Sequence, residues 1–327
     1  MKRMNGARAA TKYSLIATGG FVLLALAWGI LVEPRWLDEK HITGNIPRLP
    51  ASWEGKKVGL MADLQVGMWL DNLSTIEESV ARLCRMKPAF VIIAGDFVYH
   101  PTEEERAEAI RELEPDIASE VQRQVGTVIR LLAPLNTSRI PTYAVLGNHD
   151  YAMENERALK LPGVAAVVRR ALNRTGIVVL ENEAVVLRHP EGGSEPPLYL
   201  VGIGPAYPDR ANISRAFRGV PAQAARIVVC HNPITFARIP AGKAPLAVAG
   251  HTHGGQIRIP FTADWTWMNL IGEQSYHADG WVEQSYGHAN NTLYVNRGIG
   301  FSVAPIRINA RPELTIISLT NGNNDTR

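Results

Sequence analysis

VIIAGD at residues 91–96 and YAVLGNHD at residues 143–150 are the most informative segments of the chain for its fold class. Each opens with the β-branched and other apolar residues of a buried strand, and each closes on a glycine followed by polar side chains. Apolar residues at helical spacing over 72–86 precede the first stretch, and a charged helical segment over 103–132 separates the two. Strands that alternate with helices in this way predict parallel pairing and an α/β fold.

Polar clusters follow five of the predicted strands, each just past the end of an apolar run. Besides the two stretches already quoted, MAD ends at Asp63, VVCHN contains His231, and LAVAGHTH ends at His253. In α/β sheets, ligands bind outside the carboxyl ends of the strands. The five clusters are therefore expected to converge on one place. A lone Gly-Asp or His-x-His is usually a turn or a solvated pair, so the prediction depends on all five together.

The converging side chains are carboxylates, amides and imidazoles, with no thiolate among them. Such oxygen and nitrogen donors suit Mn, Fe, Zn or Mg. Their number, about seven, exceeds the four ligands of a tetrahedral metal site. It is enough for two metal ions that share a bridging carboxylate. The two cysteines, Cys84 and Cys230, lack paired-thiolate spacing and are interpreted as buried structural thiols.

The order GD, GNHD, H and GHTHGGQ resembles the calcineurin-like metallophosphoesterase family. GHTHGGQIRIP and the closing YVNRGIG are similar to the membrane-associated bacterial branch of that family. The resemblance covers residues 55–320, which is nearly all of the chain beyond its N-terminal segment. It implies a four-layer α/β/β/α sandwich of two mixed sheets. The strand-rich second half of the chain agrees with a second sheet.

The resemblance also implies a role for each matching position. Two divalent metal ions would be bound, the first by Asp63, Gln65, Asp96 and His253, and the second by Asp96, Asn148, His231 and His251. Asp96 would bridge the two ions, and a hydroxide activated by both would attack phosphorus in line. His149 would lie beside the leaving oxygen as an acid or phosphate donor.

Gln65 departs from the family's pattern. The first motif of the family usually reads D-x-H, whereas residues 63–65 of this chain read DLQ. The carbonyl oxygen of glutamine is a neutral and weaker ligand than imidazole. The first metal site is therefore expected to bind less tightly, or to prefer a harder metal such as Mn or Mg.

A second departure concerns the partner of His149. Many relatives carry an aspartate three residues after the bridging aspartate, and this chain has Tyr99 there. His149 would then lack its usual orienting group. Asp150 is the candidate replacement, and it is counted with His149 among the catalytic residues.

Residues 14–32 read SLIATGGFVLLALAWGILV and carry no charge. At about 1.5 Å per residue this segment spans roughly 28 Å, close to the thickness of a bilayer core. Basic residues in the tail 1–13 predict a cytoplasmic N-terminus and an extracytoplasmic body, periplasmic or at the cell surface. The alternative is a cleaved signal peptide with Ala25-Leu26-Ala27 as its cleavage site. The apolar run continues past that site, which favours a retained transmembrane anchor.

Three further segments follow the anchor. Residues 33–54 contain two proline-bearing stretches and are predicted to be a linker. Residues 55–320 would form the metallophosphoesterase domain. The polar residues 321–327 are expected to be a disordered tail.

The charge of the chain argues against nucleic acid as its main partner. The formal net charge is +3, and four basic residues with no acid lie in the first thirteen positions. The remainder therefore carries 3 − 4 = −1. Binding to a phosphate backbone needs a clustered basic surface, so a nuclease is disfavoured.

The leading hypothesis is metal-dependent hydrolysis of a phosphoester at the membrane surface. The substrate would be a phosphodiester, a phosphomonoester or a lipid-linked pyrophosphate. The alternative is a metal-binding scaffold with little turnover that acts as an interaction module at the membrane. Gln65 motivates this alternative, while His149 speaks against it, because a binding module has no need of that residue.

Overall fold

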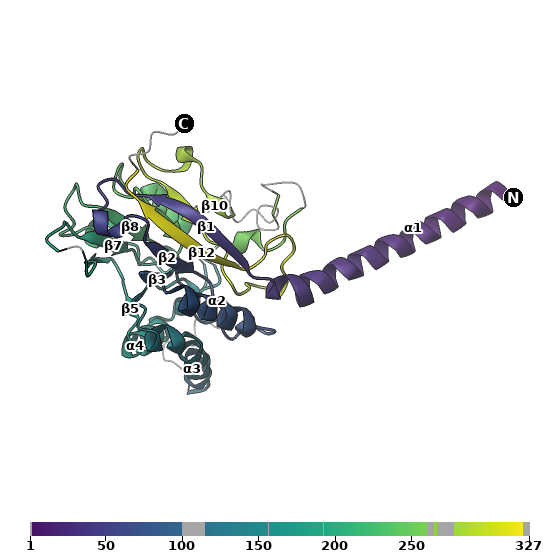
Figure 1. Cartoon of the computed structure of the whole chain (residues 1–327). Helices are drawn as coiled ribbons and strands as arrows, with labels where there is room; N and C mark the ends of the chain where they lie inside the picture. The colour runs from purple at the N-terminus through teal and green to yellow at the C-terminus, as the bar shows by residue number, and fades with distance from the viewer. Residues whose placement is uncertain are drawn as a thin grey trace.

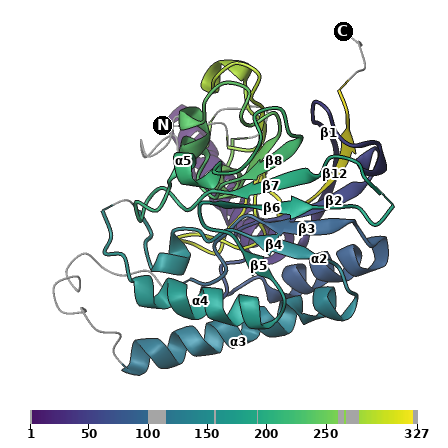
Figure 2. The ribbon, with the colours of Figure 1, turned by 90° about the vertical axis from the view of Figure 1, so that its left-hand side faces the viewer.

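Two six-stranded β-sheets packed face to face form the body of the molecule (Figure 2). The computed structural model describes residues 2–99, 115–155, 157–191, 193–259, 265–266 and 278–322, and omits the side chains of 2–11 and 115–118. The first sheet has the strand order β1-β12-β2-β3-β4-β5. Its strands are β1 Asp38–Asn45, β2 Lys57–Met61, β3 Phe90–Ile93, β4 Thr142–Ala144, β5 Val178–Val179 and β12 Glu313–Thr320. The neighbours from β2 to β5 pair in parallel, and β12 runs antiparallel to β2.

The second sheet has the order β10-β11-β9-β8-β7-β6 and is also mixed. Its strands are β6 Glu183–Leu187, β7 Leu198–Gly202, β8 Arg226–Val229, β9 Ala247–Ala249, β10 Gly280–Trp281 and β11 Leu293–Val295. β7, β8, β9 and β11 are parallel, while β6 and β10 lie antiparallel at the two edges. All residues of β8 and β9 are buried, as expected for parallel strands covered on both faces.

Helices cover the outer face of each sheet. The first sheet is covered by α2 Leu73–Met86, α3 Pro115–Thr137 and α4 Pro162–Arg174 (Figure 2). Among the described residues, the second is covered by α5 Ile213–Ala216 and by short 3-10 helices, of which Pro233–Arg238 is one. Three apolar cores separate these layers, and the middle one lies between the two sheets. The predicted four-layer α/β/β/α sandwich is confirmed, with a thin fourth layer.

The helix α2 illustrates how the sequence builds one layer. Ile76, Val80 and Leu83 recur at helical spacing and are buried against the first sheet. Lys87 ends the helix in the left-handed conformation, with φ of 51°, and its N–H donates to the carbonyl of Leu83 at 2.9 Å. Such a C-terminal residue satisfies a carbonyl that the helix leaves unpaired.

Residues 38–45 differ from the linker expected over 33–54, because they form the edge strand β1. This strand pairs in parallel with β12 along its whole length, from Asp38 opposite Glu313 to Asn45 opposite Thr320. Its sequence, DEKHITGN, is mostly polar and shows no clean apolar alternation. An edge strand with exposed side chains can form with few apolar residues. Hydrophobic periodicity therefore did not predict β1.

Other predicted elements differ more modestly. Residues 256–259, expected to be a strand, make only isolated bridges from Ile257 to Ile308 and from Arg258 to Thr266. Of the helix predicted over 103–132, the part before residue 115 lies outside the described residues. Most of the predicted disordered tail, residues 323–327, lies outside them as well.

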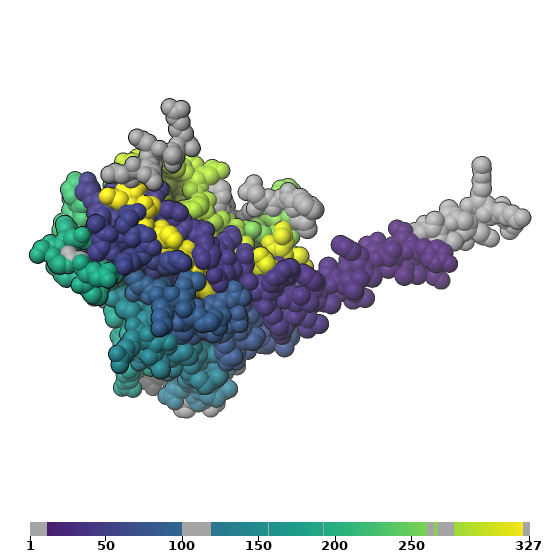
Figure 3. All heavy atoms as spheres, in the orientation of Figure 1, coloured from purple at the N-terminus to yellow at the C-terminus, as the bar shows by residue number. Residues whose placement is uncertain are grey.

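An apolar helix projects from the body at the N-terminus (Figures 1 and 3). It comprises α1 Lys2–Ala27, a π-helical turn Trp28–Val32 and a 3-10 turn Glu33–Arg35. The most apolar 18-residue window within residues 12–35 has a mean hydropathy of 2.3, and 6% of that window is buried. By length and composition it could cross a membrane, although a signal sequence would have the same properties.

The base of this helix is fixed to the body by polar contacts. The carbonyl of Gly29 accepts a hydrogen bond from the backbone N–H of Arg307 at 2.9 Å. The carboxylate of Glu33 accepts from the backbone N–H of Ala310 at 2.6 Å. The segment around residues 306–311 therefore holds the helix end in place.

Candidate metal centre

The seven side chains predicted to bind metal are buried, and all follow the carboxyl ends of strands. β2 leads to Asp63 and Gln65, β3 to Asp96, β4 to Asn148, β8 to His231, and β9 to His251 and His253. The strands β2, β3 and β4 belong to the first sheet, and β8 and β9 belong to the second. The site is thus assembled at one end of the sandwich, where both sheets contribute, in line with the general rule for α/β sheets.

Close backbone packing makes this assembly possible. A Cβ atom at Gly147 would collide with the carboxylate of Asp96. A Cβ at Gly298 would lie 2.5 Å from Oδ2 of Asp63, and the φ of Gly298 is +68°. Asp63 and Asp96 themselves have φ values of 52° and 57°. Left-handed backbone at non-glycine residues costs free energy and clusters at functional sites.

The first group of candidate ligands contains Asp63, Asp96 and His253. One ligand atom from each lies within 4.8 Å of the others. Gln65 adjoins this group: its Nε2 donates to Oδ2 of Asp96 at 3.1 Å and lies 3.5 Å from Nε2 of His253. The Oε1 atom of Gln65 has no hydrogen-bond partner within the described part of the chain. Buried acceptors are normally paired, so this free lone pair fits a cation.

The second group contains Asp96, His231 and His251, whose ligand atoms also lie within 4.8 Å of one another. Nε2 of His231 is 3.1 Å from Oδ2 of Asp96 and 3.0 Å from Oδ1 of Asn148. Asp96 belongs to both groups. Each group thus contains three of the residues that the family resemblance implies for one cation, and Asp96 is common to both.

Hydrogen bonds from outside the two groups fix the histidine rings. Nδ1 of His231 lies 2.7 Å from the carbonyl of Ala94, which directs Nε2 toward Asp96. Nε2 of His251 lies 3.0 Å from the hydroxyl of Tyr207, which orients this ring. Metal-binding histidines usually use their second nitrogen in this way.

The protonation states of the rings follow from burial and from the carboxylates. Burial, with help from the charge of His231, lowers the pKa of His251 to about 3. Burial and the nearby Arg307 hold the pKa of His253 well below its ordinary value. Burial alone would lower the pKa of His231, but Asp96 raises it to about 9. Metals bind neutral imidazole, so a cation held here would disfavour the protonated form of His231 that Asp96 stabilises.

The predicted catalytic residue His149 lies at the edge of the two groups. Its backbone N–H donates to Oδ1 of Asp96 at 2.9 Å. Its ring stacks on Tyr99, with centroids 5.0 Å apart and an interplanar angle of 27°. Tyr99 thus occupies the face of the imidazole rather than bonding to a ring nitrogen. Burial lowers the pKa of His149.

Asp150 has a different role from the orienting one that the sequence suggested. Its two carboxylate oxygens accept hydrogen bonds from the backbone N–H groups of Asp96, Phe97, Val98 and Gly147, at 2.9 to 3.4 Å. These contacts clamp the turn that carries the bridging aspartate. The side chain is committed to backbone donors, so we regard Asp150 as a positioning residue.

Three contributors to the site were not singled out as ligands or catalysts from sequence. The first is Tyr207, described above. Asn232 donates from Nδ2 to Oδ1 of Asn148 at 3.3 Å, and its place directly after His231 in VVCHN was the available signal. The guanidinium of Arg307 is buried and donates to the backbone carbonyls of Gly300 and His253. It holds together the loops that carry the first group.

The residues present fit a pair of divalent cations. The donors are oxygen and nitrogen, two groups share one carboxylate, and an amide oxygen is left without a partner in the described chain. A buried centre of this kind, at the strand ends of an α/β/β/α sandwich, defines a binuclear metallohydrolase.

A sequence model of the calcineurin-like phosphoesterase family matches residues 56–255, and the chain belongs to this family. The phosphodiesterase YaeI of Escherichia coli (strain K12) is 27% identical over 93% of this chain and 97% of its own length. YkuE of Bacillus subtilis (strain 168), an uncharacterized metallophosphoesterase, is 24% identical over 99% of this chain and 97% of its own length. LpxG of Chlamydia trachomatis, a UDP-2,3-diacylglucosamine pyrophosphatase, is 24% identical over 90% of this chain and 93% of its own length.

Family membership and the two ligand groups together make the chain a metal-dependent hydrolase of phosphoester bonds. Its cofactors are divalent metal ions, for which the donor set suits Mn, Fe, Zn or Mg. The family predicted from GD, GNHD, H and GHTHGGQ is confirmed.

Proposed function

We propose that this chain hydrolyses a phosphodiester or a lipid-linked pyrophosphate at a membrane surface. The observation that carries the proposal is the sharing of Asp96 between two buried ligand groups. Two cations held in this way can activate water and neutralise the charge that develops on a phosphoryl group.

The residues of the chain divide the remaining work. Asp63, Gln65, Asp96 and His253 hold one cation, and Asp96, Asn148, His231 and His251 hold the other. His149 lies beside them and donates a proton or a hydrogen bond to the leaving oxygen. Burial lowers the pKa of this ring, and a nearby anionic phosphate would favour its protonated form.

The substrate class is inferred from the relatives and from the N-terminal helix. One relative is a phosphodiesterase, and another is a pyrophosphatase of a diacylated nucleotide sugar. The exposed apolar helix α1 supports attachment to a bilayer, where lipid-linked substrates reside. The basic residues before the apolar run favour a cytoplasmic N-terminus and an extracytoplasmic body.

The test uses the full chain in detergent micelles. Hydrolysis of bis-p-nitrophenyl phosphate and of p-nitrophenyl phosphate is measured after metal stripping, and again with Mn, Mg, Zn or Fe added. Activity should return with metal and should fall about 10²–10⁴-fold in His149→Ala, the range that acid catalysis supplies. His288→Ala, at an exposed histidine, is the matched control.

Two ligand variants probe the site assignment. Asn148→Ala and His231→Ala should each abolish metal-dependent turnover, because each removes a proposed ligand of the second cation. Full activity in both variants would overturn the assignment.

Gln65 motivates one competing function, a membrane-bound metal scaffold with little turnover. Its amide donates to Asp96, so part of the first group is held by a neutral side chain. Stoichiometric metal at the site together with no hydrolysis of either ester would favour this function over the enzyme.

A further inference from the structure

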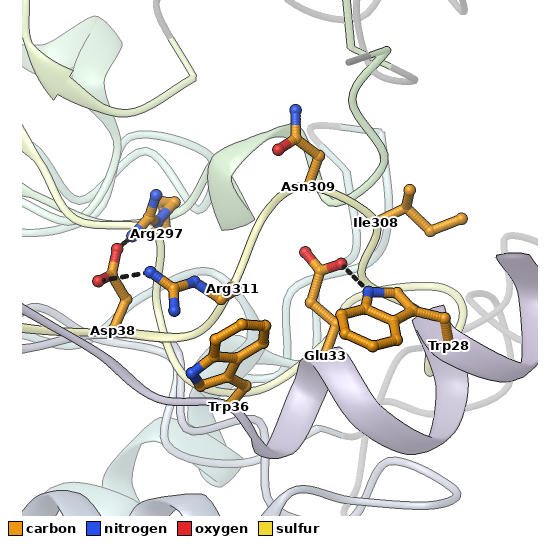
Figure 4. A pocket seen from close by; sticks show the side chains of 8 residues that line it. All are labelled: Trp28, Glu33, Trp36, Asp38, Arg297, Ile308, Asn309 and Arg311. Carbon is orange, nitrogen blue, oxygen red and sulfur yellow. Dashed lines mark hydrogen bonds and ion pairs between the residues drawn. The ribbon is translucent and has the colours of Figure 1, made fainter. Parts of the chain in front are cut away.

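A second cavity lies at the base of the N-terminal helix. Its volume is about 480 Å³, and Trp28, Glu33 and Trp36 line it from the helix end (Figure 4). Asn309 and Arg311 line it from the loop before β12. We call it the juxtamembrane cavity. None of these residues belongs to the metal centre.

The acidic groups of the juxtamembrane cavity are already paired. The carboxylate of Glu33 accepts hydrogen bonds from the indole of Trp28 at 2.9 Å and from the backbone N–H of Ala310. Asp38 forms ion pairs with Arg297 and with Arg311 (Figure 4). Glu33 is 4% exposed, so it presents little negative charge to an incoming ligand.

Hydrogen-bond donors, by contrast, remain available in the cavity. Arg311 has a side-chain exposure of 33% and makes one ion pair, through a single terminal nitrogen, with Asp38 at 2.8 Å. Its guanidinium stacks over the ring of Trp36, with 4.7 Å to the centroid. The amide of Asn309 and the indole N–H of Trp36 have no hydrogen-bond partner among the described residues, and both side chains are exposed. A stacked arginine with two neutral donors beside it suits the oxygens of a phosphate.

The position of the cavity indicates which phosphate. Trp28 and Trp36, 44% and 52% exposed, flank the C-terminal end of the apolar stretch 12–35. Exposed tryptophans at the end of a spanning helix lie at the level of the lipid headgroups. A cavity between them therefore opens where phospholipid phosphates are concentrated.

We propose that the juxtamembrane cavity binds the phosphate of a membrane phospholipid, with Arg311 as the cation and Asn309 and Trp36 as additional donors. This inference rests on the proposed insertion of α1 into a bilayer, and it is independent of hydrolysis. A bound lipid would hold the body at a fixed height and orientation above the membrane.

The experiment measures lipid binding by native mass spectrometry. The full chain, delipidated in detergent, is titrated with a short-chain phosphatidylglycerol. Arg311→Ala should weaken binding about tenfold, the loss expected for a charged hydrogen bond. Arg130→Ala, at an exposed arginine of α3, is the matched control and should bind like the parent chain.

A second variant guards against misfolding of Arg311→Ala. Asn309 has φ of +56°, a conformation that glycine adopts freely, so Asn309→Gly removes the amide without backbone strain. It should weaken binding about threefold, at the lower end for a neutral hydrogen bond. Thermal unfolding of each variant checks that the fold persists.

The source of the phosphate is tested by competition. Inorganic phosphate and glycerol phosphate, at tenfold excess, should displace little of the lipid. Equal displacement by the free anions would show that the site does not select a lipid. Lipid binding that is equal in Arg311→Ala, Asn309→Gly and Arg130→Ala would overturn the proposal.

Hydrolysis of bis-p-nitrophenyl phosphate, measured on the same samples, keeps the two proposals apart. Lipid binding that is lost while turnover persists isolates a defect of the juxtamembrane cavity. If the chain does not hydrolyse the ester but still binds lipid in a way that depends on Arg311, the proposed function is refuted and the lipid site is supported.

Discussion

Gln65 is the single residue at which the metal centre departs most from its family. Its neutral amide stands where an imidazole is usual, and its Nε2 is engaged by Asp96. Gln65→His should restore a nitrogen donor and raise zinc affinity about tenfold or more, because even changes to residues that only hydrogen-bond to a ligand alter affinity by about 10–100-fold. Competition with a chelating dye measures this affinity.

Gln223→His, at an exposed position, controls for zinc that binds to any added histidine. Unchanged affinity in Gln65→His would show that residue 65 is not a ligand position.

Tyr207 acts one step further from the metal. Its hydroxyl lies 3.0 Å from Nε2 of His251 and orients the imidazole ring. Tyr207→Phe should lower metal occupancy about tenfold while leaving thermal stability nearly unchanged. Elemental analysis after dialysis measures occupancy, with Tyr199→Phe on β7 as the control. Equal occupancy in the two variants would assign Tyr207 a packing role only.

These residues also show how far sequence reasoning reaches. The ligand candidates could be predicted because each directly follows an apolar strand, and strand ends meet at one edge. Tyr207 could not, because its loop after β7 reaches His251 only through the packing of the second sheet. Asp150 lies in the GNHD motif, so its position was predictable. Its hydrogen bonds to the backbone of the turn at Asp96 were not, because motif spacing does not indicate which distant backbone N–H groups a side chain contacts.

Among the elements, β1 depends on close packing at Gly44. A Cβ there would lie 2.7 Å from a methyl of Leu246 and 2.8 Å from one of Ile317. Gly44→Val should therefore destabilise the fold by about 1–3 kcal/mol, the usual cost of overpacking. Thermal unfolding measures the change. Thr43→Val, at the neighbouring exposed position, should be nearly neutral, and equal stability of the two variants would argue against a docked β1.

The same strand marks the limit of prediction at the scale of elements. The central strands and α2 were predictable because their buried faces impose an apolar period on the sequence. β1 lies at the edge of its sheet, and its polar side chains are half-buried or exposed. The strand is held by its backbone hydrogen bonds to β12. Every residue type except proline can make such bonds, so they produce no pattern of side chains in the sequence.

For the whole molecule, metal removal should weaken the junction between the two sheets. The centre gathers ligands from β2, β3 and β4 on one sheet and from β8 and β9 on the other. Without cations, burial raises the pKa of the Asp63 carboxyl to about 7, although the charge of His231 acts to lower it. Cations bound only by the folded state should stabilise it by about 2.7 kcal/mol when present at 100 times their dissociation constant. Calorimetry with and without chelator measures this, and an unchanged melting temperature would contradict it.

At the scale of the whole molecule, the N-terminal helix is the candidate attachment to a membrane. We expect the mature chain to keep residues 1–27, and to stay in the membrane fraction after a carbonate wash. Leu23 and Leu24 are 69% and 72% exposed, so water surrounds them unless a bilayer does. Leu23→Arg with Leu24→Arg should release the chain, because each arginine costs about 2.5–3.5 kcal/mol at the centre of a span. An intact mass that begins at residue 28, with soluble protein, would instead identify a cleaved signal. The contacts of Gly29 and Glu33 would survive that cleavage, so the body would fold alike in both cases, and only attachment to the membrane would differ.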